Sequence, residues 1–381
     1  MLPLLIDQPE ALAAFAADAA QASWLAVDTE FMRERTYYPR LCLLQIATEA
    51  NVACIDPIAL DDLGPILDVL FDPHIRKVFH AAGQDLEVLY HLTGRVPAPV
   101  FDTQIAAALA GFGDQCGYAK LVQGLLDVEL PKVHTRADWA RRPLSEAELR
   151  YAADDVLYLR GVYSRLSEDL QARGRLAWLE DDFAALADPR RYRPDPGTAW
   201  RRVKGWMQLK PRQQQVLLRL AQWREQRAMA LDRPRRWVLK DEVLLDLARR
   251  QPAAPDDLGR IRGLPAAIAQ RDGRELLALV AAGAQVEPQP LAARPQKLQP
   301  QQEPTVDLLM AALRTLAGGR DLSPGSLASR RDLERLVLGE RDLALLEGWR
   351  GRICGRALLD ILEGRLNLGV EDGRVRLVAS D

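Results

Sequence analysis

Four acidic residues and one tyrosine are the side chains of this sequence whose types and spacing could perform chemistry. They are Asp28, Glu30, Asp85, Asp155 and Tyr151. Carboxylates that share a small volume repel one another and raise one another's pKa, so such a group is costly unless a cation neutralises it. A few oxygen ligands, with space left for a substrate phosphate, suit Mg²⁺ or Mn²⁺. We therefore predict a divalent-metal site built from the four carboxylates, with Tyr151 beside it.

The first two carboxylates belong to a predicted strand at residues 24–31. Side chains alternate between the two faces of a strand, so Asp28 and Glu30 point to one side and Thr29 to the other. An Asp-x-Glu pair also occurs at solvated strand ends. The apolar residues 25–27 just before the pair favour a buried strand, and the ends of buried strands are where sites of α/β proteins cluster.

Asp85 lies in the first turn of a predicted helix. Residues 77–80 form a short predicted strand, Gly83 interrupts it, and the helix runs from Asp85 to Leu92 and ends at Gly94. A carboxylate in this place can also satisfy free backbone N–H groups at the helix start. The three other acids are what favour a catalytic role for Asp85.

The fourth acid lies on a long predicted helix that runs from residue 146 to about residue 173. Ser145 followed by Glu148 predicts a capping box at its start. Tyr151 and Asp155 are four residues apart and therefore share one face of the helix. A tyrosine beside a metal-binding carboxylate could orient or deprotonate a water molecule.

These segments resemble a known enzyme superfamily. "VDTEF", "VFHAAGQDLEVL" and "YAADDVLYL" are similar to the three motifs of the DEDD 3′–5′ exonucleases, in the subgroup marked by a tyrosine. The text "TEFMRERTYYPRLCLLQIAT" around the first motif resembles the ribonuclease D family in particular. The subgroup marked by a histidine is disfavoured, because Arg150 stands where that histidine would be, five residues before Asp155.

The resemblance implies hydrolysis of a phosphodiester at a free RNA 3′ end, with release of nucleoside 5′-monophosphates. It also implies two divalent ions, Mg²⁺ or Mn²⁺, which act about 3.5 to 4 Å apart on the attacking water and the leaving oxygen. In this scheme Asp28 bridges both ions. Glu30 and Asp155 complete the site of the ion that carries the water, Asp85 holds the second ion, and Tyr151 hydrogen-bonds the water. The expected substrates are the 3′ ends of tRNA precursors and other structured RNA, and the expected state is a monomer.

Four residues next to these motifs are candidates for substrate binding: Thr29, Phe31, His80 and Gln84. Phe31 could stack on the terminal base, because base stacking tolerates any sequence. His80 could reach a phosphate or the terminal ribose. A residue such as Phe31 more often lies in the core, and a buried histidine bonded to the backbone is at least as good an interpretation for His80.

The charge of the chain changes sign along its length. Residues 1–200 hold 30 acids and 19 bases, whereas residues 190–240 hold 15 lysines or arginines and three acids. Neutralisation of phosphates drives nucleic-acid binding, so we predict a nucleic-acid arm here. Its candidate contacts are Arg201, Arg202, Lys204, Lys210, Arg235 and Arg236. Four tryptophans, Trp200, Trp206, Trp223 and Trp237, are interleaved and could stack on bases, although the amphipathic pattern around Trp223 favours the core.

The predicted fold is an α/β ribonuclease H-like exonuclease domain, a mixed sheet flanked by helices, followed by two all-α HRDC helical bundles. A meander of strands followed by helix-linked strands supports the mixed sheet, and the resemblance implies the rest. The expected divisions are an exonuclease domain at 1–190, a basic linker at 191–209, a first HRDC domain at 210–286, a Pro/Gln-rich linker at 287–304 and a second, diverged HRDC domain at 305–381. HRDC domains are helical modules that bind nucleic acid.

Two alternative functions remain open at this point. A DNA proofreading or repair exonuclease would use the same chemistry, because no residue reveals recognition of the ribose 2′-OH. A non-catalytic nucleic-acid-binding module is disfavoured, because all four acids are present. The composition is that of a globular protein, with 48% apolar and 27% charged residues and a net charge of −2. Neither a signal peptide nor a long apolar run is evident, so we expect a cytoplasmic protein.

Overall fold

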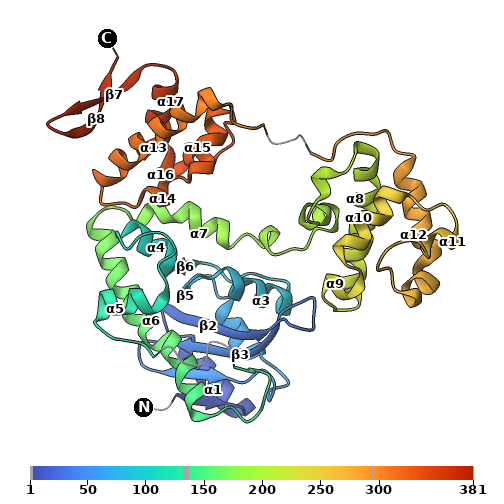
Figure 1. The fold of residues 1–381 in the computed structure, drawn as a ribbon. Helices are drawn as coiled ribbons and strands as arrows, with labels where there is room; N and C mark the ends of the chain where they lie inside the picture. The colour runs from blue at the N-terminus through green and yellow to red at the C-terminus, as the bar shows by residue number, and fades with distance from the viewer. Residues whose placement is uncertain (1–2, 132–136, 293–295, 381) are drawn as a thin grey trace. The chain divides into compact units, whose positions relative to one another are not determined.

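The computed structural model describes residues 3–131, 137–292 and 296–380. The chain divides into two compact units (Figure 1). Unit 1 comprises residues 1–32, 41–192 and 296–381, and unit 2 comprises residues 33–40 and 193–295. The catalytic motifs predicted from the sequence therefore all belong to unit 1, and most of the basic segment belongs to unit 2.

A six-stranded mixed sheet forms the centre of unit 1, with the strand order β1-β4-β3-β2-β5-β6. Its strands are β1 (Leu4–Ile6), β2 (Trp24–Met32), β3 (Arg40–Ala47), β4 (Val52–Ile55), β5 (Arg76–Phe79) and β6 (Val100–Asp102). β4 pairs antiparallel with β3, whereas β5 pairs parallel with both of its neighbours, β2 and β6. The mixed sheet expected from the sequence is confirmed. Strand β1, which pairs parallel with β4, was not predicted.

Helices cover both faces of this sheet, because strand side chains alternate between the faces. Leu25 and Val27 of β2 pack in one cluster with α1 (Pro9–Ala19), α2 (Gly64–Leu70) and α3 (Gly83–Thr93). Ala26 packs in another cluster with residues of three further helices. These are α4 (Thr103–Leu109), α5 (Tyr118–Leu126) and α6 (Glu146–Ala172).

The C-terminal segment also belongs to unit 1, and we call residues 296–380 the C-terminal module. Its helices are α13 (Glu303–Gly318), α14 (Pro324–Leu327), α15 (Arg330–Val337), α16 (Gly348–Arg350) and α17 (Arg356–Leu362). Leu309, Leu313 and Leu333 share a hydrophobic cluster with Val156 and Leu159 of α6. The C-terminal module and α6 therefore bury a common core.

The prediction that this region is all-α is wrong, because it ends in a β-hairpin. Strands β7 (Leu366–Glu371) and β8 (Arg374–Ala379) pair antiparallel. The turn between them is formed by Asp372 and Gly373, which both have positive φ, 51° and 72°. An Asp-Gly pair tolerates the left-handed backbone that a tight hairpin turn requires, and this local chemistry decides the structure.

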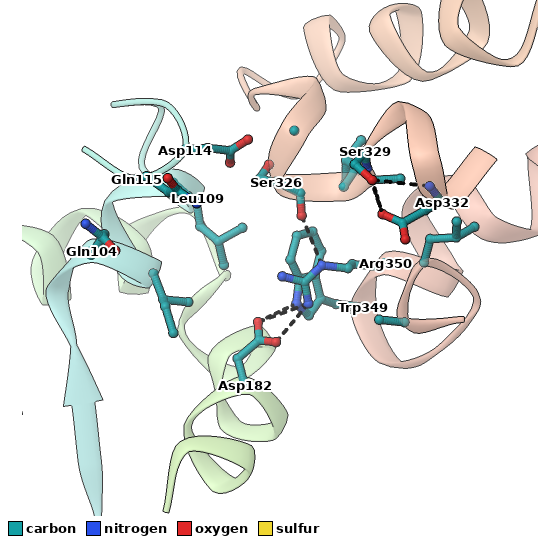
Figure 2. A pocket seen from close by; sticks show the side chains of 17 residues that line it. Gln104, Leu109, Asp114, Gln115, Asp182, Ser326, Ser329, Asp332, Trp349 and Arg350 are labelled. Atoms are coloured by element: carbon teal, nitrogen blue, oxygen red, sulfur yellow. Dashed lines mark hydrogen bonds and ion pairs between the residues drawn. The ribbon is translucent and has the colours of Figure 1, made fainter. Parts of the chain in front are cut away.

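Two residues of the C-terminal module bind α7 (Glu180–Leu186) of the same unit (Figure 2). The guanidinium of Arg350 donates to both carboxylate oxygens of Asp182, at 2.8 and 3.1 Å, and its Nε donates to the Ser326 carbonyl at 3.0 Å. The indole N–H of Trp349 also donates to Asp182, at 3.2 Å, and its ring stacks on Trp178. These contacts border a cavity of about 590 Å³.

Unit 2 is helical. Its helices are α8 (Pro211–Ala230), α9 (Arg235–Val238), α10 (Asp241–Arg250), α11 (Pro255–Leu258) and α12 (Ala266–Ala284). Leu217, Leu220 and Leu244 lie in its core with Trp200 and Trp223. The predicted linker at 287–304 lies partly outside the described residues, since it includes residues 293–295. Among the described helices of the whole chain, none has the length and apolar character to cross a membrane.

Candidate metal centre

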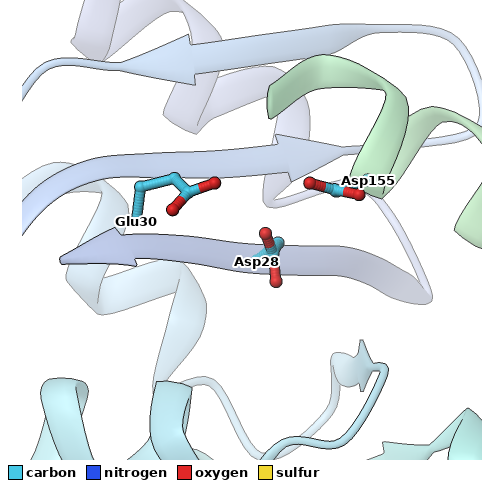
Figure 3. A group of neighbouring side chains, drawn as sticks. All are labelled: Asp28, Glu30 and Asp155. Carbon is cyan, nitrogen blue, oxygen red and sulfur yellow. The ribbon is translucent and has the colours of Figure 1, made fainter. Parts of the chain in front are cut away.

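Strand β2 and helix α6 bring three of the four predicted acids together. Asp28, Glu30 and Asp155 each place a carboxylate oxygen within 4.8 Å of the others (Figure 3). Asp28 and Glu30 share one face of β2 because they are two residues apart, and α6, which packs on that same face, supplies Asp155. Two elements more than a hundred residues apart in sequence thus meet at one point.

Asp85 lies near this group but is held by a separate contact. The Thr29 hydroxyl donates to the Asp85 carboxylate at 2.6 Å, and both side chains are buried. Burial raises the pKa of Asp85 to about 7, although the hydrogen bond from Thr29 opposes this shift. Thr29, expected as a substrate contact, therefore supports Asp85 from the other face of β2.

Burial and mutual repulsion raise the pKa of every carboxyl in the group. For Asp28 burial is the largest cause, followed by the charges of the other acids, and its pKa lies well above the usual range. Burial and the charges of Asp155 and Asp85 raise the pKa of Glu30 to about 8. Burial, with the charges of Asp154 and Asp85, raises the pKa of Asp155 to about 7. A divalent cation would remove this repulsion, and the all-oxygen donor set fits such an ion.

Tyr151 lies one turn before Asp155 on α6 and is partly buried. Its ring stacks on the buried Trp139, with centroids 6.2 Å apart. Burial, with the charges of Asp155 and Glu30, raises the pKa of Tyr151 above its usual value. The phenol therefore stays protonated at neutral pH and can donate a hydrogen bond.

The start of α6 is fixed by the predicted capping box. The Glu148 backbone N–H donates to the Ser145 hydroxyl at 3.3 Å, and the Ser145 N–H donates to the Glu148 carboxylate at 2.7 Å. Just before the cap, the Arg142 guanidinium donates to both oxygens of Asp56, which follows β4. These contacts tie the first turns of α6 to the sheet and so position Tyr151 and Asp155.

Asp102 fixes the start of α3, as the capping box fixes the start of α6, and this residue was missed in the sequence. Its buried carboxylate accepts the backbone N–H groups of Ala81 at 3.0 Å, Ala82 at 2.9 Å and Gln104 at 2.8 Å. Ala81 has a φ of 59°, which is uncommon for a residue other than glycine. Asp102 thus holds the turn from which α3 presents Asp85. Its position just before a helix was the available sequence signal.

Tyr118 was also missed. Its hydroxyl donates to the Asp154 carbonyl at 2.9 Å, and burial with the charges of Asp155 and Asp28 raises its pKa well above the usual value. The charges of these acids reach Tyr118, so it borders the centre. Tyr118 lies on α5, a helix that was not predicted, and no local spacing links residue 118 to the three motifs.

The other candidate substrate contacts differ in exposure. Phe31 is partly buried and packs against the cluster that contains Leu25. His80 is partly buried, with its Nδ1 3.0 Å from the Thr103 hydroxyl and its ring 5.4 Å from that of Tyr118. Burial lowers the pKa of His80, so its ring is neutral at pH 7. Gln84 is exposed in the first turn of α3.

The six predicted arm residues separate into two kinds. Arg235 donates to the buried Glu225 at 2.5 Å, and Arg202 lies 3.7 Å from the same carboxylate. The remaining four, which are exposed, are Arg201, Lys204, Lys210 and Arg236. Part of the positive charge expected to bind phosphate is therefore committed to contacts inside unit 2.

Two family models match parts of the chain. Residues 3–171 match the family model described as a 3′–5′ exonuclease, and residues 213–280 match the HRDC domain. The chain is 43% identical to ribonuclease D of Gluconacetobacter diazotrophicus over 99% of its own length and 97% of the relative's. It is 41% identical to ribonuclease D of Sphingobium indicum, over 98% of each chain.

A solved structure agrees with these relatives. The crystal structure of Escherichia coli RNase D, described as an exoribonuclease involved in structured RNA processing, matches with a TM-score of 0.83. The two chains are 33% identical, and the match covers 95% of this chain and 99% of the other. The catalytic core of RRP6 from Trypanosoma brucei matches with a TM-score of 0.56 and 25% identity. The similarity thus extends over the exonuclease sheet and the helical parts together.

Proposed function

Because this chain belongs to the ribonuclease D family, we propose that the three-carboxylate group on β2 and α6, together with Asp85, is the active site of a 3′–5′ exoribonuclease. The chain hydrolyses RNA from its 3′ end and releases nucleoside 5′-monophosphates. The convergence of Asp28, Glu30 and Asp155 within 4.8 Å supports the site most directly. The family also favours RNA over the DNA alternative, and the intact acidic group disfavours a non-catalytic module.

Two divalent ions, Mg²⁺ or Mn²⁺, are the proposed cofactors. Asp28, Glu30 and Asp155 would hold one ion, with Asp28 shared by a second ion near Asp85. When bound, the ions supply Lewis acidity at the scissile phosphate and lower the pKa of a water molecule. Asp85 keeps its orientation through the Thr29 hydroxyl.

The remaining roles belong to side chains of unit 1. Tyr151 is protonated and donates a hydrogen bond that orients the attacking water. Phe31, His80 and Gln84 are proposed to contact the terminal nucleotide, and Thr29 acts by holding Asp85. Because His80 is neutral, it suits a ribose hydroxyl better than a role as a phosphate counter-ion.

Membership of the family does not specify the RNA substrate, the oligomeric state or the domain boundaries of this chain. We propose the 3′ ends of tRNA precursors and other structured RNA as substrates, and a monomer as the active form. Arg201, Lys204, Lys210 and Arg236, which are exposed, are the proposed phosphate contacts of unit 2, with Arg202 and Arg235 in supporting contacts. The expected divisions at 1–190, 191–209, 210–286, 287–304 and 305–381 remain proposals, as does the descent of the C-terminal module from a second HRDC domain.

The test of the site is the variant Asp28→Asn. Loss of the shared carboxylate is expected to lower nucleotide release from a 3′-extended tRNA by at least about a hundredfold in the presence of Mg²⁺. The measurement is release of 5′-monophosphates with Mg²⁺, with Mn²⁺ and with a chelator. Glu168→Gln is the matched control, because Glu168 is exposed on the same helix, α6, away from the acidic group. Full activity of a folded Asp28→Asn protein, or release that persists in the chelator, would overturn the proposal.

A further inference from the structure

Unit 2 exposes one aromatic side chain. Among the phenylalanine, tyrosine and tryptophan residues that the structure describes, Trp237 alone is exposed, with 61% of its surface accessible. Trp200 and Trp223 are buried in the core of unit 2, and Trp206 is partly buried with its ring against Trp200. An exposed tryptophan of this extent loses apolar burial and has no packing role to explain it.

The backbone that carries Trp237 is held firmly. Trp237 lies on the short helix α9, whose neighbouring residues Val238 and Leu239 are buried. The Arg235 guanidinium donates to Glu225, which is 1% exposed, and the Tyr37 hydroxyl donates to the same carboxylate. Because Arg235 and Val238 face inward, the indole between them is directed outward on a fixed support. Such a support limits the entropy lost when a ligand binds.

Three exposed cations surround Trp237 in sequence: Arg233, Arg236 and Lys240. None of them forms an ion pair with the described residues. Two of the acids in this segment are occupied: Asp232 accepts the backbone N–H groups of Tyr37 and Tyr38, and Asp241 pairs with Arg224 at 2.6 Å. Glu242 is exposed at the start of α10. The segment therefore presents a flat aromatic surface and a surplus of unpaired positive charge.

We propose that Trp237 is a stacking platform for an unpaired base of the RNA substrate, with Arg233, Arg236 and Lys240 contacting the adjacent phosphates. This inference rests on the proposed function, since it assigns a binding surface for the same substrate. A single-stranded segment is the fitting partner, because an unpaired base can offer a free π face, whereas the bases of a duplex are stacked on one another. The platform discriminates by base accessibility and not by sequence.

Binding of RNA to the full-length protein in chelator tests the platform without hydrolysis. The probe is a labelled oligouridylate of about 12 nucleotides, a length within the range that one binding module covers. Trp237→Ala is expected to weaken binding by about 5- to 100-fold, whereas Trp237→Phe retains most of the affinity because it keeps an aromatic face. Met207→Ala is the matched control, because Met207 is an exposed apolar residue of the same unit, with 52% of its surface accessible.

Two further measurements separate the contribution of the phosphate contacts from that of base stacking. Arg236→Gln and Lys240→Gln are each expected to reduce the slope of log K against log salt by about 1, whereas Trp237→Ala leaves that slope unchanged. A duplex of the same length is expected to bind Trp237→Ala and the unaltered protein equally. Equal binding of oligouridylate by Trp237→Ala and the unaltered protein, or equal weakening by Trp237→Phe and Trp237→Ala, would overturn the platform.

Failure of this inference is distinguishable from failure of the proposed function. Trp237→Ala leaves every residue of the proposed active site in unit 1 unaltered, so it is expected to leave hydrolysis of a diribonucleotide with Mg²⁺ unchanged. If the diribonucleotide is hydrolysed and Trp237→Ala has no effect on long RNA, only the platform is wrong. If the unaltered protein hydrolyses neither substrate, the proposed function is wrong.

Discussion

Each carboxylate at the metal centre destabilises the folded chain when no cation is bound. A carboxyl with a raised pKa in the folded state binds a proton that the unfolded chain releases at the same pH, so stability falls as pH rises between the two pKa values. For Glu30 that window runs from its ordinary value of 4.5 to about 8. The residues that would bind the metal therefore oppose folding at neutral pH.

Glu30→Gln is accordingly expected to stabilise the metal-free protein at alkaline pH. The substitution removes a charge that burial and the carboxylates of Asp155 and Asp85 disfavour. At pH 8.5 the expected gain in the free energy of unfolding is about 1 to 3 kcal/mol, and near pH 4 the difference should vanish. Urea denaturation in a chelator measures it.

Added Mg²⁺ provides the control for this prediction. Because the ion binds the folded state, it should stabilise the unaltered protein more than Glu30→Gln, and its effect should grow as pH rises and protons leave the site. A metal-free Glu30→Gln protein that is less stable than the unaltered protein at pH 8.5 would contradict the repulsion inferred at this centre.

At the scale of elements, the start of α3 depends on a residue of β6, whereas the strand that precedes α3 in the sequence is β5. Asp102, at the end of β6, accepts three backbone N–H groups, two of them in the turn before α3. That turn contains Ala81 in a left-handed conformation. The hydrogen bonds therefore determine where Asp85 lies relative to β2.

Asp102→Ala is expected to lower the free energy of unfolding by about 2 to 4 kcal/mol, because buried N–H groups lose their acceptor. Activity should fall further than stability explains, since the Asp85 carboxylate loses its position. Asp102→Asn should be milder, because the amide oxygen can still accept. The measurement is kcat and Mg²⁺ dependence at a temperature where circular dichroism shows all proteins folded. Unchanged Mg²⁺ dependence in folded Asp102→Ala would show that Asp102 does not position Asp85.

At the scale of the whole molecule, the C-terminal module is part of the catalytic unit. Its leucines share a core with α6, the helix that carries Tyr151 and Asp155. The ion pair between Arg350 and Asp182, with Trp349 on the same carboxylate, joins the C-terminal module to α7 (Figure 2). Changes in the C-terminal module are therefore expected to affect the stability of the exonuclease domain.

Arg350→Ala tests this connection. Arg350 and Asp182 are each mostly buried, with 24% and 22% of their side chains accessible. Loss of one partner of such a pair should cost about 2 to 4 kcal/mol of unfolding free energy. Arg365→Ala is the matched control, because the Arg365 side chain is 59% accessible and its pair with Asp360 should contribute less than about 1 kcal/mol. A double-mutant cycle with Asp182→Ala measures the coupling energy of the pair. Additive effects of the two substitutions on the free energy of unfolding would show that the pair does not connect the C-terminal module to α7.

Local spacing in the sequence was sufficient for much of the metal centre and the elements that carry it. The two-residue period of a strand puts Asp28 and Glu30 on one face, and the four-residue spacing on a helix puts Tyr151 and Asp155 on one face. The capping box at Ser145 is likewise a local pattern and is confirmed. The family assignment followed from three such motifs in order.

Other features depended on contacts between distant residues. Exposure separates Trp237 from Trp200, yet both stand in similar basic surroundings in the sequence. Only the burial of Trp223 was predicted, from the amphipathic pattern around it. Two further contacts could not be predicted from the sequence: the ion pair of Arg235 with Glu225, and the hydrogen bond that Asp102 accepts from Ala81. The hairpin at the end of the chain had a local signal in its Asp-Gly turn and was overlooked. Spacing along the chain determines only which face a side chain occupies, whereas its burial and partners depend on which elements pack against that face.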